Sequence, residues 1–268
     1  MRETLREAKD TLVPPREVGP LPPLLIVLTV VTGLVDALSY LELGRVFVAN
    51  MTGNVVFTGF ALAGTPGLSV AASMAALAAF LVGAAAGGRL GAAFGDRKLL
   101  LLRVGCTLQA VLIAAALVVA AAVSGLGTGE RYTLILLLGL AMGLQNAVAR
   151  RLAVPDLTTT VLSQTLTGLA ADLRRFGGPG SRAGRRLLAA VAMALGAFSG
   201  ATLVLQVHVL IAFAAPLVLL VGVAGCAYRL DRPTRAAGVR DEVARPPHPD
   251  ADPGPVGPPD GPPDGKSV

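Results

Sequence analysis

The sequence has no tryptophan, only two cysteines and two histidines, and few charges, since charged residues make up 15% of its 268 residues. A soluble domain carries roughly 25% charged residues. Three long stretches, 46–88, 104–129 and 187–228, hold no Asp, Glu, Lys or Arg at all. Because a helix needs about 20 apolar residues to cross a bilayer core, this scarcity of charge excludes a soluble globular domain. It predicts an all-α polytopic membrane protein whose main partner is the lipid bilayer.

The scarcity of reactive side chains also argues against an enzyme. Cys106 and Cys226 both lie inside apolar runs far apart in the sequence, so they indicate neither a disulfide framework nor a metal cluster. The apolar part of the chain has one histidine, His208, which cannot assemble a metal site alone. No nucleophile elbow, phosphate-binding loop or dinucleotide fingerprint is present. Asp36 and Asp156 lack the motif of a paired-carboxylate protease. We expect no catalytic residue, no metal and no cofactor.

The formal net charge of +6 does not indicate nucleic-acid binding. Most of the excess basic residues lie in short loops between apolar runs, where they report orientation in a membrane. Residues 1–20 hold four Lys/Arg, four acids and three prolines, without a cleavable signal sequence after them, and we interpret them as a cytoplasmic leader. Residues 229–268 hold ten prolines and almost no large apolar side chain. Such a composition cannot bury enough surface to fold, so we expect a disordered cytoplasmic tail.

Residues 21–228 form the predicted membrane domain, which contains eight apolar or semi-apolar segments. Two of them, 46–63 and 153–170, are short for a span and carry a cluster of polar residues. The other six are long and apolar enough to span, namely 21–41, 69–88, 104–124, 132–149, 187–205 and 209–228.

The loop charges indicate how the two short segments lie. If both are re-entrant, entering and leaving on one side, the cytoplasmic loops carry eleven Lys/Arg and the outer loops carry only Arg45 and Arg131. If both span, the same residues divide six to seven, with no bias. Since cytoplasmic loops hold the excess of Lys/Arg, the sequence favours six spans, two re-entrant segments and two cytoplasmic termini. The eleven residues are Arg89, Arg97, Lys98, Arg103, Arg150, Arg151, Arg174, Arg175, Arg182, Arg185 and Arg186.

The sequence also contains an internal repeat at an offset of 106 residues, between 21–124 and 132–228. Because each unit holds three spans, two tandem copies must face opposite ways across the membrane, which gives the 3+3 inverted repeat of many transporters. The aligned positions are Gly33 with Gly139, Asn50 with Asp156, Thr52 with Thr158 and, after an insertion of seven residues, Gly83 and Gly87 with Gly196 and Gly200.

The polar clusters of the two short segments form the candidate substrate-binding site. Asn and Thr side chains offer both donors and acceptors, and glycine lets the backbone approach a ligand. Non-helical backbone at membrane depth is tolerated only where protein or a water-filled cavity surrounds it. The alternative is a polar cluster that only packs helices together. The candidate residues are Asp36, Asn50, Thr52, Gly53, Asn54, Gln145, Asn146, Thr158, Thr159 and Thr160.

Asp36 is a candidate because an acid inside a span is costly to bury and suggests function by default. It would carry a proton or hold a cation. The alternative is an interfacial acid that pairs with Arg45 or caps a break in the chain, because Asp36 lies near the end of its span. Gln145 and Asn146 end the fourth span, where the repeat aligns them with Ser39 and Tyr40, and we expect them to face the same cavity from the opposite leaflet.

The glycine pairs Gly83/Gly87 and Gly196/Gly200 predict faces of close helix packing. Small residues let two helices approach each other in a membrane. We expect these faces to be mainly structural, and they also offer a route to a homo-oligomer.

Two stretches resemble a known family. The pairing of G-L-V-D-A-L-S-Y at 33–40 with F-V-A-N-M-T-G-N at 47–54 resembles the signature of the YoaK family of uncharacterised bacterial membrane proteins (domain of unknown function 1275). A-M-G-L-Q-N-A at 141–147 resembles the second-half motif of that family, and the resemblance covers residues 24–228. The family has no established activity. The resemblance therefore implies a location in the bacterial cytoplasmic (inner) membrane.

These features together predict permease-like translocation of a small molecule or ion, of unidentified nature, through a polar site at mid-membrane. The alternative function is a non-transporting membrane scaffold or assembly factor. A carrier should have a polar, water-accessible cavity at mid-membrane, whereas a scaffold should be packed solid there.

The six-span arrangement predicts that residues 126–130 and 176–182 lie on opposite sides of the membrane. Single cysteines introduced into each loop should therefore react with a membrane-impermeant maleimide from opposite sides. Labelling of both loops from the same side of oriented vesicles would rule out the six-span arrangement.

Overall fold

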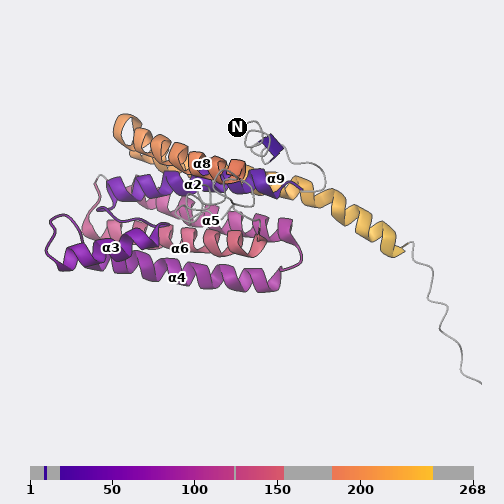
Figure 1. Cartoon of the computed structure of the whole chain (residues 1–268), viewed down its shortest axis with the longest axis horizontal. Coiled ribbons are helices and arrows are strands. Elements are labelled where there is room, and N and C mark those ends of the chain that lie inside the picture. Colours follow the sequence, from indigo (N-terminus) through magenta and orange to yellow (C-terminus); the bar gives the residue numbers. More distant parts are fainter. Residues whose placement is uncertain (1–8, 11–18, 124, 154–182, 244–268) are drawn as a thin grey trace, which may run out of the picture. The chain divides into compact units, whose positions relative to one another are not determined.

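The computed structural model describes residues 9–10, 19–123, 125–153 and 183–243. In this part of the chain the regular structure is helical and contains no strand (Figure 1). The elements are α2 (Leu21–Glu42), α3 (Met51–Leu62), α4 (Val70–Ala93), α5 (Lys98–Ala122), α6 (Thr128–Leu152), α8 (Ala183–Thr202), the π-helical turn η2 (Leu203–Val207) and α9 (Val209–Val243).

Six stretches of helix are long and apolar enough to cross a membrane, which confirms the all-α prediction with six spans. α3 has 12 residues and is too short to cross, as predicted for that part of the chain. The six stretches are Leu21–Glu42, Val70–Ala93, Lys98–Ala122, Thr128–Leu152, Gly184–Val207 and Val209–Asp231.

The chain divides into two compact units after Asp231. α9 continues through this point to Val243, so helix extends beyond Arg229, where the sequence predicted the disordered tail to begin. Residues 229–243 include four Arg and two Ala, which favour helix, and also Pro233 and Gly238, which disfavour it. Residues 244–268 lie outside the described residues.

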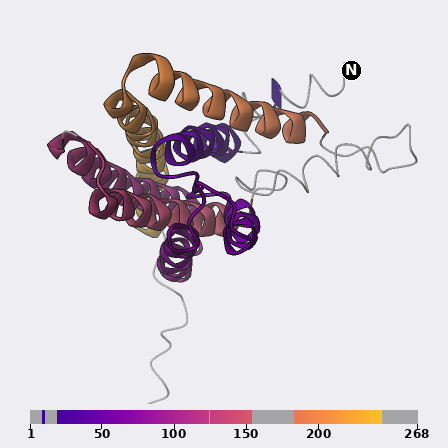
Figure 2. The ribbon, with the colours of Figure 1, turned by 90° about the vertical axis from the view of Figure 1, so that its left-hand side faces the viewer.

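Two helices, α2 and α6, form the centre of the first unit. In the most apolar 18-residue window of each, 72% of the α2 residues and 61% of the α6 residues are buried, against 22–33% in the other four spans. Figures 1 and 2 show the order α8, α2, α6, α4 across the bundle, with α8 beside α2 and α4 beside α6. α5 packs against α6, where a Cβ added at Gly105 would lie 2.9 Å from Val148.

α4 packs directly against the backbone of α6. A Cβ added at Gly83 would meet the carbonyl oxygen of Leu140, and one added at Gly87 would lie 2.8 Å from the carbonyl oxygen of Leu144. The residue numbers rise together along the contact, so the two helices run parallel. Glycine allows this approach because any larger side chain would hold the backbones apart.

α8 packs against α2 in the same manner. A Cβ added at Gly196 would meet the carbonyl oxygen of Val30, and one added at Gly200 would lie 2.8 Å from the carbonyl oxygen of Leu34. These helices also run parallel. Both predicted glycine faces are therefore occupied within the chain, and the homo-oligomer that the sequence analysis placed on them would need a different surface.

The two glycine contacts match residue by residue, but in a register that differs from the predicted one. Gly143 on α6 meets the carbonyl of Phe80, as Gly33 on α2 meets the carbonyl of Met193. Gly143 lies 110 residues after Gly33, whereas the sequence repeat paired Gly33 with Gly139 at an offset of 106. At the offset of 110 that these contacts share, Asp36 aligns with Asn146, whereas at the offset of 106 it aligns with Met142.

The segment between α2 and α4 leaves and rejoins the bundle at the same end. The chain reverses at Gly44 and Arg45, which have φ angles of 92° and 57°. It returns along α2 as far as Ala49, whose N–H reaches Asp36, and α3 then leads back to the starting end. There a Cβ added at Gly67 would lie 3.2 Å from Nη1 of Arg45. This path is the one expected of a re-entrant segment.

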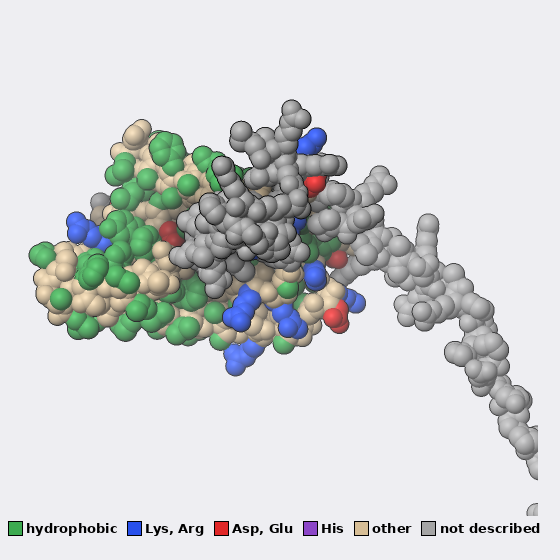
Figure 3. Space-filling model, in the orientation of Figure 1, with side chains coloured by type: hydrophobic (Ala, Val, Ile, Leu, Met, Phe, Trp, Pro, Cys, Tyr) green, Lys and Arg blue, Asp and Glu red, His purple; other side chains and the backbone are tan. Residues whose placement is uncertain are grey.

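Charged side chains gather at the two ends of the bundle. At one end, Arg103 of α5 lies 3.7 Å from Asp231 of α9, and Arg151 ends α6. At the other end, Arg131 lies close to Gly44. On the face that Figure 3 shows, Lys and Arg side chains gather over the right-hand end and are few at the left-hand end.

We predict that Gly83→Ala lowers the stability of the purified protein by about 1–3 kcal/mol, because the new methyl group overpacks the backbone contact with α6. Gly88→Ala is the control, since a Cβ added at Gly88 on the same helix has no atom within 4 Å. Thermal unfolding in detergent would measure both variants. Equal melting temperatures would show that the backbone contact between α4 and α6 does not stabilise the fold.

Candidate functional site

The Asp36 side chain holds the re-entrant loop. Its Oδ1 accepts hydrogen bonds from the backbone N–H of Val48 at 3.2 Å and of Ala49 at 2.8 Å. Asp36 is 4% exposed, and its Oδ2 is buried without a hydrogen-bond partner in the described part of the chain. The two N–H donors favour the charged form of this carboxyl group, whereas its burial disfavours that form. The carboxyl group thus stabilises the loop through one of its two oxygens.

Asn54 holds the same loop from the other side. Its Oδ1 accepts a hydrogen bond from the backbone N–H of Phe47 at 3.0 Å, and its Nδ2 donates to the carbonyl oxygen of Phe47 at 2.6 Å. The side chain is fully buried. Gly53 allows Phe47 to pack closely, because a Cβ at Gly53 would lie 2.7 Å from the ring. Asn54 therefore stabilises the loop through hydrogen bonds, and Gly53 allows the Phe47 ring to pack against α3.

The other two residues of this polar cluster have a different position. Asn50, which directly precedes α3, and Thr52 in its first turn are exposed in the structure. The Asn50 side chain does not cap the helix. These two polar groups remain available to a ligand or to the rest of the chain, and their role as substrate-binding residues stays a prediction.

Aromatic side chains cover the loop on the face of Phe47. Its ring stacks on Tyr40 at a centroid distance of 5.1 Å and on Phe57 at 5.6 Å. Phe60 continues the cluster at 6.4 Å from Phe57. The sequence analysis missed this cluster, although four of the eleven Phe and Tyr residues fall within 40–60.

A second polar group lies between the central helices. Gln145 of α6 donates from Nε2 to Oγ1 of Thr32 on α2 at 2.8 Å, and its Oε1 accepts from Nε2 of Gln109 on α5 at 2.7 Å. All three side chains are buried. The network links three helices, as polar residues often do in membranes. The sequence analysis missed Gln109 and Thr32, whose only signal is a single polar residue within an apolar run.

Asn146 follows Gln145 but points elsewhere. Its Nδ2 donates to the carbonyl oxygen of Met142 within α6 at 3.0 Å, and the side chain is partly buried. These hydrogen bonds therefore distinguish the two adjacent candidates, because Gln145 bonds to α2 and α5, whereas this bond of Asn146 lies within α6. Thr158, Thr159 and Thr160 lie outside the described residues.

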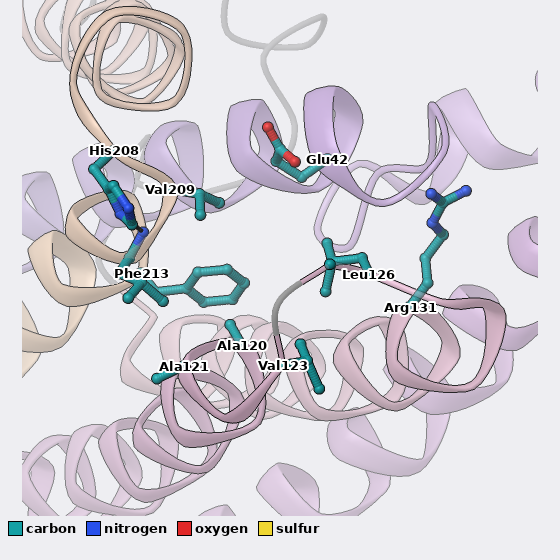
Figure 4. A pocket seen from close by; sticks show the side chains of 11 residues that line it. Glu42, Ala120, Ala121, Val123, Leu126, Arg131, His208, Val209 and Phe213 are labelled. Atoms are coloured by element: carbon teal, nitrogen blue, oxygen red, sulfur yellow. Dashed lines mark hydrogen bonds between the residues drawn. The ribbon is translucent and has the colours of Figure 1, made fainter.

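A pocket of about 470 Å³ opens at the end of the bundle where α2 ends and α6 begins. Figure 4 shows the Phe213 ring pointing into it, with Glu42 and Arg131 on opposite walls. None of the candidate residues lines this pocket, and it does not lie at mid-membrane depth. Its lining residues are Glu42, Ala120, Ala121, Val123, Gly125, Leu126, Arg131, His208, Val209, Leu210 and Phe213.

The described residues contain no group of three His, Cys, Asp or Glu that could hold a metal ion. Both cysteines are free, Cys106 in a buried position and Cys226 in an exposed one.

Comparison with known proteins places this arrangement in a family. The model of a family of proteins of unknown function (DUF1275) matches residues 24–226. This chain belongs to that family. It is also similar to the UPF0700 transmembrane protein YoaK of Bacillus subtilis (strain 168), with 34% identity over 151 residues. The match covers 56% of this chain and 66% of YoaK, which is just under two thirds of that protein. No solved structure matches the chain.

Family membership confirms the resemblance found in the sequence, and it shows that this DUF1275 protein is a membrane protein with several spans. The motif G-L-V-D-A-L-S-Y now has a structural meaning. Gly33 provides the close contact with α8, and Asp36 provides the acceptor for the loop.

We predict that Asn54→Ala destabilises this DUF1275 protein by about 1–3 kcal/mol, because it leaves the buried N–H and C=O of Phe47 without partners. Thr52→Ala is the matched control, since Thr52 lies in the same helical turn but is exposed. Unfolding temperature and proteolysis of the 43–50 loop would measure the difference. Two variants that unfold alike would contradict the structural role of Asn54.

Proposed function

We propose that this DUF1275 protein is a permease that moves a small cation, or a polar molecule together with a proton or cation. The Asp36 carboxylate is its binding group. The proposal includes a location in the bacterial inner membrane with both termini in the cytoplasm. The separation of basic residues between the two ends of the bundle supports this orientation.

The observation that carries the proposal is that one oxygen of the buried Asp36 carboxyl group lacks a hydrogen-bond partner among the described residues. Buried polar atoms nearly always have a hydrogen-bond partner, yet Oδ2 of Asp36 has none among the described residues. No basic side chain of the described residues forms a salt bridge with Asp36. A buried carboxylate without a basic partner is costly unless something neutralises it, and a transported proton or cation would do so.

The form of the backbone beside Asp36 supports the same function. Transporters bind substrates where helices are interrupted, because freed backbone groups and helix ends can contact the substrate. Here the interruption falls between Leu43 and Asn50, and it is followed by the N-terminus of α3.

A 3+3 inverted repeat is part of the proposal. Exchange of the two halves converts the contact of α4 with α6 into the contact of α8 with α2, and the glycines at both contacts meet equivalent backbone atoms. Such a relation would allow the two halves to exchange their conformations, which underlies alternating access in many transporters.

A second candidate function is a scaffold, and one observation favours it. The polar groups of Thr32, Gln109 and Gln145 at the centre of the bundle satisfy one another. A solid, paired centre stabilises helix packing and offers no passage. In that case Asp36 would serve only to hold the loop.

Dicyclohexylcarbodiimide, which modifies carboxyl groups in apolar surroundings, tests the role of Asp36. We expect mass spectrometry to find the adduct on Asp36 in membrane vesicles. We expect sodium or low pH to change its rate of formation, because a bound cation or proton alters the carboxylate.

Transport itself is measured in proteoliposomes, with pyranine for protons and with radioactive sodium. Asp36→Asn should abolish uptake while the protein stays folded, because the amide keeps the shape of the side chain and removes the charge. Glu130→Gln is the control, since it neutralises an acid in the first turn of α6. Equal uptake by the parent and Asp36→Asn would favour the scaffold.

A further inference from the structure

We infer that Asn146 is the second-half counterpart of Asp36, and that the two side chains form a charged and a neutral cation-coordinating position. This inference rests on the proposed function, which names a cation as the transported species. It goes beyond that function because it assigns a second binding position for the cation and states that only one of the two positions is charged.

The helix contacts set the correspondence. α4 meets α6 at Leu140 and Leu144, and α8 meets α2 at Val30 and Leu34, each of which lies 110 residues earlier than its counterpart. Ala147 and Ala37 are related by the same offset of 110. The Cβ of Ala147 lies 2.8 Å from the Cβ position of Gly87, and the Cβ of Ala37 lies 3.1 Å from the Cβ position of Gly200. At this offset Asn146 corresponds to Asp36.

The sequence agrees with this register once the contacts have fixed it. Residues 33–37 read G-L-V-D-A, and residues 143–147 read G-L-Q-N-A. Three of the five positions are identical, and one of the two differences replaces a carboxylate with the amide of the same size. An amide oxygen coordinates a cation but cannot carry its neutralising charge.

The depths of the two side chains also correspond. Asp36 lies six residues before Glu42, the last residue of α2, and Asn146 lies six residues before Leu152, the last residue of α6. This separation is about 9 Å along each helix. Because α2 and α6 run in opposite directions, the two positions lie at equal depths from opposite ends of the bundle.

Each of the two helices ends in a similar turn. Arg45 after α2 and Ala153 after α6 have φ angles of 57° and 50°, and they are the non-glycine residues with positive φ in the described part of the chain. A left-handed residue commonly ends a helix. Each position is therefore followed, nine residues later in α2 and seven residues later in α6, by a left-handed residue that ends the helix.

The hydrogen bonds of Gln145 indicate how far apart the two positions lie along the axis of the bundle. Gln145 bonds to Thr32 and to the carbonyl oxygen of Leu28, so Asn146 lies level with 28–32 of α2. Asp36 lies between one and two turns further along α2, so the two positions differ in depth by roughly 9 Å along the helix axis.

A transplanted carboxylate tests the inference. The variants are D36N, N146D and the double variant D36N/N146D, with D36N/Q145E as the control. Q145E places an equally isosteric carboxylate one residue away, on the side of α6 that bonds to Thr32. Gel filtration in detergent shows which variants are folded, and the single variant N146D serves if a double variant does not fold.

The first measurement is the side from which each carboxylate reacts. A water-soluble carbodiimide with a charged amine is applied to right-side-out and inside-out vesicles. We expect Asp36 to react from one side and the carboxylate of N146D to react from the other, with no reaction of Q145E. Reaction of both from the same side, or a folded N146D that does not react, would overturn the inference.

The second measurement is sodium and proton uptake in proteoliposomes. We expect D36N to lose uptake, D36N/N146D to regain it and D36N/Q145E not to regain it. If the parent protein transports and D36N/N146D stays inactive, the inference is wrong. If the parent does not transport but the two carboxylates react from opposite sides, the proposed function fails and the correspondence of the two positions stands.

Discussion

Non-helical backbone inside a helix bundle must find hydrogen-bond partners, and the rest of this structure depends on how that demand is met. Water cannot satisfy these groups at membrane depth. The 43–50 segment instead bonds to two side chains, Asp36 from α2 and Asn54 from α3. One carboxyl group and one amide thus replace the backbone hydrogen bonds that a helix would have supplied. The polar groups of this loop are therefore held in place by side chains from two different helices.

The glycine contacts make room for this arrangement. α8 lies directly on the backbone of α2, and α4 lies directly on that of α6. Lipid tails are as apolar as leucine, so helices in a bilayer associate through close packing rather than through exclusion of water. The glycine positions therefore add contacts that a methyl group would prevent, beside the large apolar side chains that both central helices bury.

Much of the architecture could be predicted from the sequence, since hydropathy and loop charge determine spans independently of fine packing. The offset of 110 residues between the two glycine contacts could not. The offsets 106 and 110 differ by four residues, which is close to one helical turn of 3.6 residues. Both offsets therefore align a residue of α2 with a residue on the same face of α6. Gly139 and Gly143 both occupy that face, and only their contacts with α4 distinguish them. The roles of Asn50 and Asn54 were likewise indistinguishable, because the direction in which each side chain points depends on the path of the loop.

The pairing of the helices has a consequence for the synthesis of the protein. α4 is made before α6, and α2 is made long before α8, yet each pair packs backbone against backbone. The glycine face of α4 must therefore wait in the membrane until the fourth span emerges from the ribosome, and the face of α2 must wait until the fifth. Neither half can complete its packing alone. The order of translation thus makes the last two spans the step that closes the whole bundle, and a chain that stops before α8 would expose the bare backbone of its most buried helix to lipid or to the quality-control machinery of the membrane.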